Sequence, residues 1–304
     1  MPSVSDAAGS PASGWPTAGV IDTLIGFPTD PGRTYAAIRR SLRDTESREH
    51  FQMPAEYMFH DVPAQHDMDV DVGIASTLAE MDTYGVAIGL VSLSGNPQLV
   101  ARALERHPDR FVASWSFDPN EGMAGVRRLV EAHEVHGLKA ASFFPHGNTP
   151  QVAIDDPLAY VYYAKCVELD IPVFVTAGIP GPRVPFRSQH VEKLDQVMYD
   201  FPELVVVMRH GAEPWTDLAV KLMVKWPNLY YSTSAFAPRY YPQAIVDYAN
   251  SRGASKILYA GYYPMGLTLQ RIFSELPQVP LEDHVWPQFL RENAAKVLKL
   301  EGVA

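Results

Sequence analysis

The chain repeats a two-part unit eight times, and this repetition is the feature that most limits its fold. Short runs rich in β-branched and aromatic residues alternate with amphipathic stretches of helical spacing, and Gly, Pro and Asn separate them. Alternating strands and helices predict parallel strand pairing, and eight such units predict a (β/α)8 TIM barrel. The runs expected to form strands are 19–27, 86–93, 111–117, 138–144, 172–178, 204–210, 229–235 and 256–262.

The length and composition fit one barrel domain. With 304 residues and 47% hydrophobic residues, the chain can bury a large core. We expect this domain over residues 19–304, preceded by a tail, residues 1–18, whose Ser, Ala, Gly and Pro cannot build a core by themselves. A polar and aromatic segment, residues 28–70, separates the first strand from its helix and is predicted to cap the barrel mouth.

The charge and the cysteine count exclude several classes of partner. A net charge of −10 repels phosphate backbones, so no nucleic-acid partner is expected. No apolar run approaches the roughly 20 residues of a membrane span, and the N-terminus lacks the pattern of a signal peptide, so we expect a soluble cytoplasmic protein. The only cysteine, Cys166, is predicted to be buried and inert.

In barrels of this kind, the chemistry takes place at the C-terminal ends of the strands. A catalytic zinc site normally uses three protein ligands, and the expected strand ends offer only Asp22, Asp118, His146 and His210, from four different strands. The side chains expected at the barrel mouth are Asp22, Leu24, Gly26, Ser92, Trp115, Asp118, Phe144, His146, Thr176, His210, Thr233 and Tyr262.

Three segments near the C-terminus identify a family resemblance. They read VVMRHGAEPW at 206–215, KWPNLYYSTSAFAPRYYP at 225–242 and KILYAGYYPMGLTLQRIF at 256–273. With them, residues 19–300 resemble the amidohydrolase-related family, in the branch that includes aminocarboxymuconate-semialdehyde decarboxylase and γ-resorcylate decarboxylase. The resemblance implies the same barrel and an active site at its mouth.

The sequence departs from the family at the positions of the metal ligands. Where the family carries an Asp-x-His-x-His signature, residues 22–26 read Asp-Thr-Leu-Ile-Gly. Thr176 stands where a histidine ligand is expected, and Tyr262 stands where an aspartate is expected. His210 is retained, and it resembles the histidine that transfers a proton in the family's decarboxylases. We therefore predict no catalytic metal and no other cofactor.

Loss of the metal changes which reactions are feasible. A metal lowers the pKa of bound water from about 15.7 to about 7, worth roughly 12 kcal/mol in hydroxide availability, whereas one general base contributes only about 10²- to 10⁴-fold. We therefore predict a metal-independent lyase or isomerase that works by proton transfer, such as a decarboxylase, a hydratase or an enzyme that cleaves carbon–carbon bonds. In this hypothesis His210 moves the proton, Glu213 orients the His210 imidazole, and Tyr262 donates a hydrogen bond to an oxyanion.

Two alternatives remain open at this stage. The first is a catalytically inactive barrel that binds a ligand. The second is a metal-dependent hydrolase with the unorthodox ligands Asp22, Asp118, His146 and His210.

The expected substrate is a small carboxylate with a cyclic or aromatic body. Guanidinium groups suit carboxylates, and the loop after the fifth strand carries Arg183 and Arg187, although pairing with surface acids explains them equally well. Aromatic side chains would make the pocket apolar, although core packing explains them as well. A homodimer or larger homo-oligomer is compatible with the exposed tyrosines expected near residue 240. The predicted substrate-binding residues are Asp22, His60, Trp115, Thr176, Arg183 and Arg187.

Overall fold

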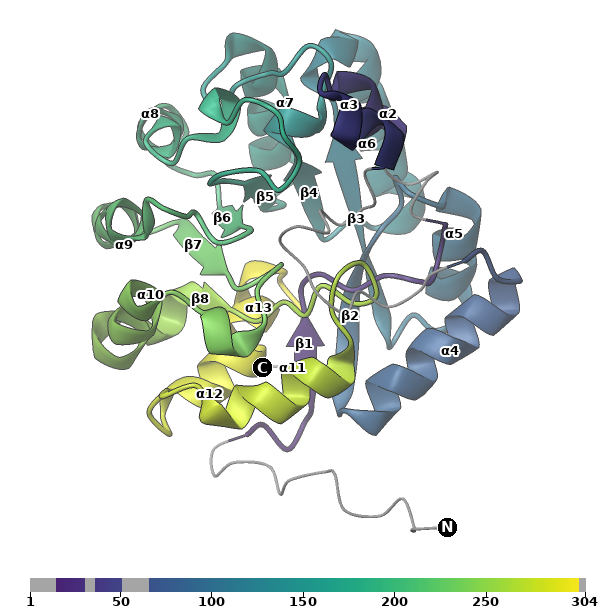
Figure 1. Ribbon diagram of the computed structural model, residues 1–304, viewed down its shortest axis with the longest axis vertical. Helices are drawn as coiled ribbons and strands as arrows, with labels where there is room; N and C mark the ends of the chain where they lie inside the picture. Colours follow the sequence, from purple (N-terminus) through teal and green to yellow (C-terminus); the bar gives the residue numbers. More distant parts are fainter. Residues whose placement is uncertain (1–14, 31–35, 51–65, 301–304) are drawn as a thin grey trace.

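Eight parallel strands form one sheet in sequence order, as the sequence predicts. The computed structural model describes residues 15–30, 36–50 and 66–300. In Figure 1 the strands curl around a central axis with helices outside them, which is a (β/α)8 TIM barrel. The strands are β1 Val20–Asp22, β2 Val86–Ser92, β3 Phe111–Phe117, β4 Ala140–Phe143, β5 Val173–Thr176, β6 Val206–Arg209, β7 Leu229–Ser232 and β8 Ile257–Leu258.

The ring closes between the residues that follow β1 and those that follow β8. The Thr23 amide donates a hydrogen bond to the Tyr259 carbonyl at 3.2 Å, and the Gly26 amide donates to the Tyr263 carbonyl at 2.8 Å. Ile25 and Tyr263 form an isolated parallel bridge. The chain after β1 therefore leaves regular strand geometry but still completes the barrel at its mouth.

Local capping signals determine where several helices begin and end. The Asp69 side chain accepts from the Asp71 amide, Asn96 accepts from the Leu99 amide, and Gly137 ends its helix with φ +60°. None of the described helices is long and apolar enough to cross a membrane. The helices around the sheet are α4 Val70–Thr83, α5 Pro97–Arg106, α6 Gly122–His136, α7 Pro157–Glu168, α8 Lys193–Asp200, α9 Thr216–Lys225, α10 Gln243–Tyr248, α11 Leu269–Glu275, α12 Val285–Pro287 and α13 Asn293–Val297.

Strand alternation divides the core into an outer layer and an inner cluster. The outer layer packs the sheet against the helices and contains Cys166, which is fully buried as predicted. The inner cluster fills the lower barrel, and α13 closes that end. Its members from the strands are Ile21, Ile88, Leu90, Ala140, Phe174, Val207, Tyr230 and Leu258.

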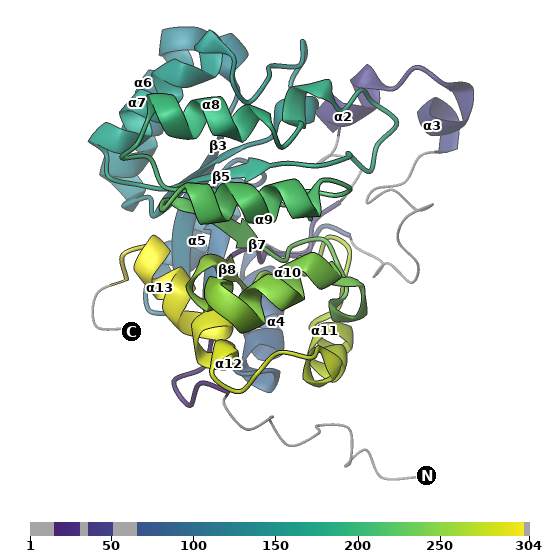
Figure 2. The same ribbon diagram turned by 90° about the vertical axis from the view of Figure 1, so that its left-hand side faces the viewer.

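The inserted segment is attached to loops at the C-terminal end of the barrel. Its described part contains α2 Ala36–Ser41 and α3 Thr45–His50. The Ser41 hydroxyl lies 3.0 Å from the Thr149 hydroxyl, after β4, and Arg183, after β5, pairs with the start of α3. Figure 2 shows both helices at the end of the molecule opposite α13.

Candidate active site

A cavity of about 320 Å³ opens above the inner cluster, at the C-terminal ends of the strands. Its position follows from composition, because inward side chains are bulky and apolar lower in the barrel and become small or polar toward the mouth. The residues lining it include Leu24, Gly26, Phe27, Ser92, Ser114, Ser116, Ser142, Phe144, Phe174, Thr176, Arg209, His210, Pro264 and Met265.

His210 lies immediately after β6 and faces this cavity. Its backbone is left-handed, with φ +63°, and the Ser234 hydroxyl holds the turn by accepting from the His210 amide at 3.1 Å. The same hydroxyl lies 3.3 Å from His210 Nδ1. Burial, and then the Arg209 guanidinium, lower the pKa of His210 to about 3. The imidazole is therefore neutral at neutral pH.

Arg209 is the cationic group of the cavity and was assigned no role from the sequence. It is the last residue of β6, and Val207, two residues earlier, belongs to the inner cluster, so Arg209 also points inward. The side chain is 7% exposed. Its Nη2 donates to the Thr23 carbonyl at 2.9 Å, and its guanidinium carbon lies 4.4 Å from the centre of the Phe174 ring. Burial lowers the pKa of Arg209 to about 9, so the group stays charged at neutral pH.

Most of a hydroxyl wall in the cavity was also missed in the sequence, which pointed only to Ser92 and Thr176. We give this name to Ser92, Ser114, Ser116, Ser142 and Thr176, which line the cavity from β2 to β5. Strand register pairs Ser92 with Ser114 and Ser116 with Ser142, so the hydroxyl groups lie side by side on neighbouring strands. Serines two residues apart on one strand mark one face of the sheet, but alternation alone does not say whether that face points inward.

The structure brings together three of the residues predicted to act in catalysis or substrate binding, and the expected mouth residues Leu24, Gly26, Ser92 and Phe144 also line the cavity. Thr176 and His210 both line the cavity. The Tyr262 ring packs edge-on against His210, with 5.4 Å between ring centres. Tyr262 is not among the residues that line the cavity, but it fixes one side of the imidazole.

Two predicted substrate-binding residues on the strands do not line the cavity. Trp115 packs against the outer layer, because its neighbours Ser114 and Ser116 take the inward positions of β3. Asp22 is fully buried outside the cavity lining, and its Oδ1 accepts from the amides of Leu24 and Gly261, each at 2.9 Å. Burial raises the pKa of Asp22 to about 7.

The loop residues also take structural positions instead of lining the cavity. Arg183 pairs with Asp44 at 3.0 Å and with Glu46 at 2.6 Å, so it anchors the inserted segment. Arg187 is exposed and does not line the cavity. The half-buried Glu213 does not line the cavity either, and its backbone carbonyl accepts a hydrogen bond from the Ile179 amide. His60 lies outside the described residues.

The donor set of the cavity does not fit a divalent metal. His210 is the only histidine in the described lining, and the charged neighbour is a cation. Asp118 instead caps a short helix by accepting from the Asn120 amide, and Nδ1 of His146 is hydrogen-bonded to Gln189. Across the part of the chain that the structure describes, no three His, Cys, Asp or Glu residues gather into a possible metal site.

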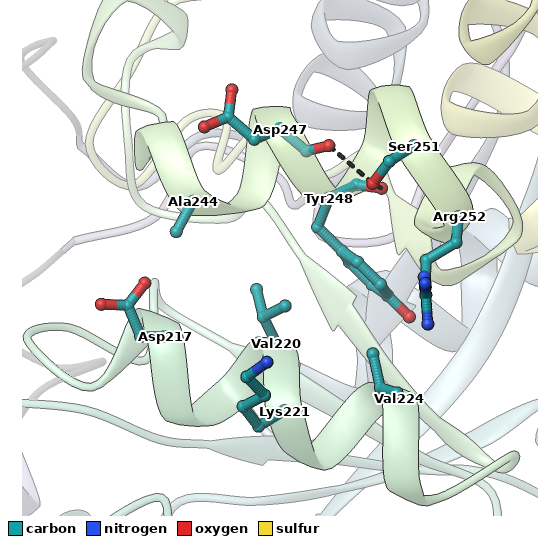
Figure 3. A pocket seen from close by; sticks show the side chains of 9 residues that line it. All are labelled: Asp217, Val220, Lys221, Val224, Ala244, Asp247, Tyr248, Ser251 and Arg252. Atoms are coloured by element: carbon teal, nitrogen blue, oxygen red, sulfur yellow. Dashed lines mark hydrogen bonds between the residues drawn. The ribbon is translucent and has the colours of Figure 1, made fainter.

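A second hollow lies on the outside of the barrel, between α9 and α10 (Figure 3). Val220 and Val224 face Tyr248 across it, and the Ser251 hydroxyl donates to the Asp247 carbonyl at 2.9 Å. This groove is far from the strand ends and holds no histidine or cysteine. The barrel cavity is therefore the candidate active site.

Comparisons with known proteins agree with this architecture. The chain is similar to an uncharacterised TIM-barrel protein of Bordetella bronchiseptica, with 23% sequence identity and a TM-score of 0.67. The matched region covers 92% of this chain and 98% of the Bordetella chain. It is also similar to 5-carboxyvanillate decarboxylase of Novosphingobium aromaticivorans, whose structure contains manganese. The identity is 17% and the TM-score 0.67, and the match covers 97% of this chain and 99% of the decarboxylase. With 2,6-dihydroxybenzoate decarboxylase of Rhizobium the identity is 16% and the TM-score 0.64, and the match covers 93% of this chain and 99% of that enzyme.

These identities are low, so the structural likeness establishes the fold alone. A comparison with curated proteins gives no match. A sequence model described as amidohydrolase, however, matches residues 28–300, which is most of the chain. The chain therefore belongs to the amidohydrolase family.

Proposed function

We propose that this chain is a metal-independent lyase or isomerase that moves a proton on a small carboxylate compound. The observation that carries the proposal is the pairing of a neutral imidazole, His210, with a buried guanidinium, Arg209, in one cavity at the barrel mouth. A base and a fixed positive charge are the two elements that a proton-transfer reaction needs.

The reaction begins with the imidazole as base. His210 takes a proton from a carbon next to a carbonyl group, the C–H electron pair becomes the C=C bond of an enolate, and the carbonyl electron pair moves onto oxygen. Arg209 stabilises this developing negative charge. Return of the proton to a different carbon completes an isomerisation. If the proton instead comes from a hydroxyl group, its O–H electron pair forms a carbonyl and the adjacent C–C bond breaks. The electron pair of that bond becomes an enolate on the departing fragment, which Arg209 stabilises and the His210 imidazolium then protonates.

The structural relatives suggest decarboxylation of phenolic acids as a third route, and one of them was crystallised with manganese. Aromatic decarboxylation starts with protonation of the ring carbon, so it needs an imidazolium in the resting site, and the low pKa of His210 leaves that form unpopulated at neutral pH. Proton removal starts from the neutral imidazole, and the imidazolium that it creates forms together with the enolate beside it. In this chain a guanidinium supplies the positive charge in the cavity. The proposal therefore favours reactions that start with proton removal. Tyr262 is proposed to hold the imidazole in place, whereas no contact of Glu213 supports a catalytic role.

Proton exchange tests the proposal even when the product is unidentified. Purified protein is incubated in D2O with a panel of hydroxy, keto and phenolic acids, and deuterium incorporation is followed by NMR. We expect exchange into at least one acid, and its loss in His210→Ala but not in His284→Ala, an exposed histidine far from the cavity. Full exchange in His210→Ala would overturn the assignment of the base. Tight binding without exchange or turnover would indicate an inactive ligand-binding barrel.

A further inference from the structure

The N–H groups of Arg209 are largely uncommitted. Only Nη2 donates a hydrogen bond to another described residue, and Nε is buried without a partner there. A guanidinium with spare N–H groups in a fixed plane matches the two oxygens of a carboxylate. A buried, unsatisfied donor is costly, so the site gains when a ligand oxygen reaches it.

Strand register places a hydroxyl group beside this guanidinium. Thr176 is the register partner of Arg209 on β5, it is 5% exposed, and both residues line the cavity. The Thr176 hydroxyl makes no hydrogen bond within the described part of the chain, so it is available to a ligand. The two side chains therefore present N–H groups and a hydroxyl group side by side to the same cavity.

Two further hydroxyl groups lie on β3 and β4, the strands that precede β5 in the sheet. Ser116 and Ser142 are register partners on β3 and β4, and both line the same cavity. Their hydroxyl groups have no hydrogen-bond partner among the described residues, whereas Ser114 already donates to the Val91 carbonyl at 3.2 Å. Phe174 is the register partner of Ser142 and lines the same cavity, and its ring centre lies 4.4 Å from the Arg209 guanidinium carbon.

We infer that the cavity takes small hydroxy or keto acids, with the carboxylate on Arg209 and Thr176 and the hydroxyl or keto oxygen on Ser116 and Ser142. A carbon between the two polar ends then lies near His210. This inference rests on the proposed function only for the reaction, since the binding site is argued from the residues themselves. It differs from the sequence-based expectation of an aromatic body.

Binding to matched acids tests the inference on the unaltered protein. Isothermal titration calorimetry compares malate and oxaloacetate with succinate, and mandelate with phenylacetate. We expect the oxygenated member of each pair to bind about tenfold more tightly, because it satisfies additional hydrogen bonds. Equal affinity within every pair would overturn the role of the serines.

Variants separate the two ends of the site. Arg209→Met is expected to weaken every acid about a hundredfold, with a smaller loss in Arg209→Lys, while Arg187→Met, an exposed arginine, leaves affinity unchanged. Ser116→Ala and Ser142→Ala are expected to remove the preference for oxygenated acids without affecting succinate, and Ser274→Ala serves as the surface control. Unchanged acid affinity in Arg209→Met would overturn the anion site.

The binding and exchange experiments fail independently. If the acid preferences appear but no acid exchanges its protons, the binding inference stands and the proposed reaction fails. If acids exchange their protons but the hydroxy and keto acids bind no more tightly than their matched partners, the reaction stands and the inferred substrate class is wrong.

Discussion

Replacing Asp22 by asparagine should stabilise the protein at alkaline pH more than at acid pH. The carboxyl is fully buried, one of its oxygens has no partner among the described residues, and burial raises its pKa from 3.8 to about 7. Between these two values the unfolded chain has released the proton while the folded chain still holds it. Each pH unit in this window therefore lowers the free energy of unfolding by about 1.4 kcal/mol.

The linkage relation gives the size of the effect. The destabilisation caused by Asp22 is about 2 kcal/mol at about pH 5 and about 4 kcal/mol at about pH 8.5. The asparagine side chain of the variant cannot ionise, and its carbonyl oxygen can still accept from the Leu24 and Gly261 amides that now bind Oδ1. The advantage of Asp22→Asn over the wild type should therefore grow by between about 2 and about 3 kcal/mol across this range, as an upper bound.

Urea denaturation followed by circular dichroism measures this difference. The wild type and Asp22→Asn are each unfolded with urea at about pH 5 and about pH 8.5. The free energies of unfolding are then compared using the same dependence on urea concentration. A difference that does not change with pH would refute the argument that a buried, protonated carboxyl lies at Asp22. A difference that grows toward acid pH would mean that the charged form is the stabilised one, through Arg209.

Three further outcomes are expected. Burial lowers the pKa of His146 from 6.5 to about 4, so the folded protein favours the neutral imidazole. The free energy of unfolding should be unaffected by this group above pH 6.5 and should fall by about 3 kcal/mol as the pH drops toward 4. A melting temperature that stays constant from pH 7 to pH 4.5 would contradict this. Gly261→Ala would place a Cβ 2.5 Å from Asp22 Oδ2 and 2.9 Å from the Tyr259 hydroxyl, so thermal melting should show strong destabilisation, and a wild-type melting point would show that the two groups move apart. Trp115→Ala should lower the free energy of unfolding by about 2 kcal/mol and leave acid affinity unchanged, and calorimetry showing weaker binding would return Trp115 to the cavity.

The fold could be predicted from the sequence because every unit carries its own strand and helix signals. All eight expected strands exist, but several are shorter than their apolar runs. The run 19–27 yields only Val20–Asp22, because the following residues bond to the segment after β8 instead of continuing a regular strand. Such closure depends on residues far away in the sequence.

The site was only partly predictable because periodicity does not say which face of a barrel strand points inward. In β3 both faces carry apolar residues, so nothing in FVASWSF favoured the serines over Trp115 as the cavity-facing set. Arg209 stood in a recognised motif, but its inward direction became evident only with Val207 in the inner cluster. The loop residue Arg183 pairs with acids nearly 140 positions earlier, which no local pattern reveals.

The central claim is that His210 and Arg209 carry the reaction without a metal, and stripping the protein of metal tests this most directly. The rate of deuterium incorporation into the best acid is measured before and after dialysis against a chelator, and again after manganese is added back. We expect the same rate in all three states, with loss only in His210→Ala. A rate that disappears with the chelator and returns with manganese would contradict the account.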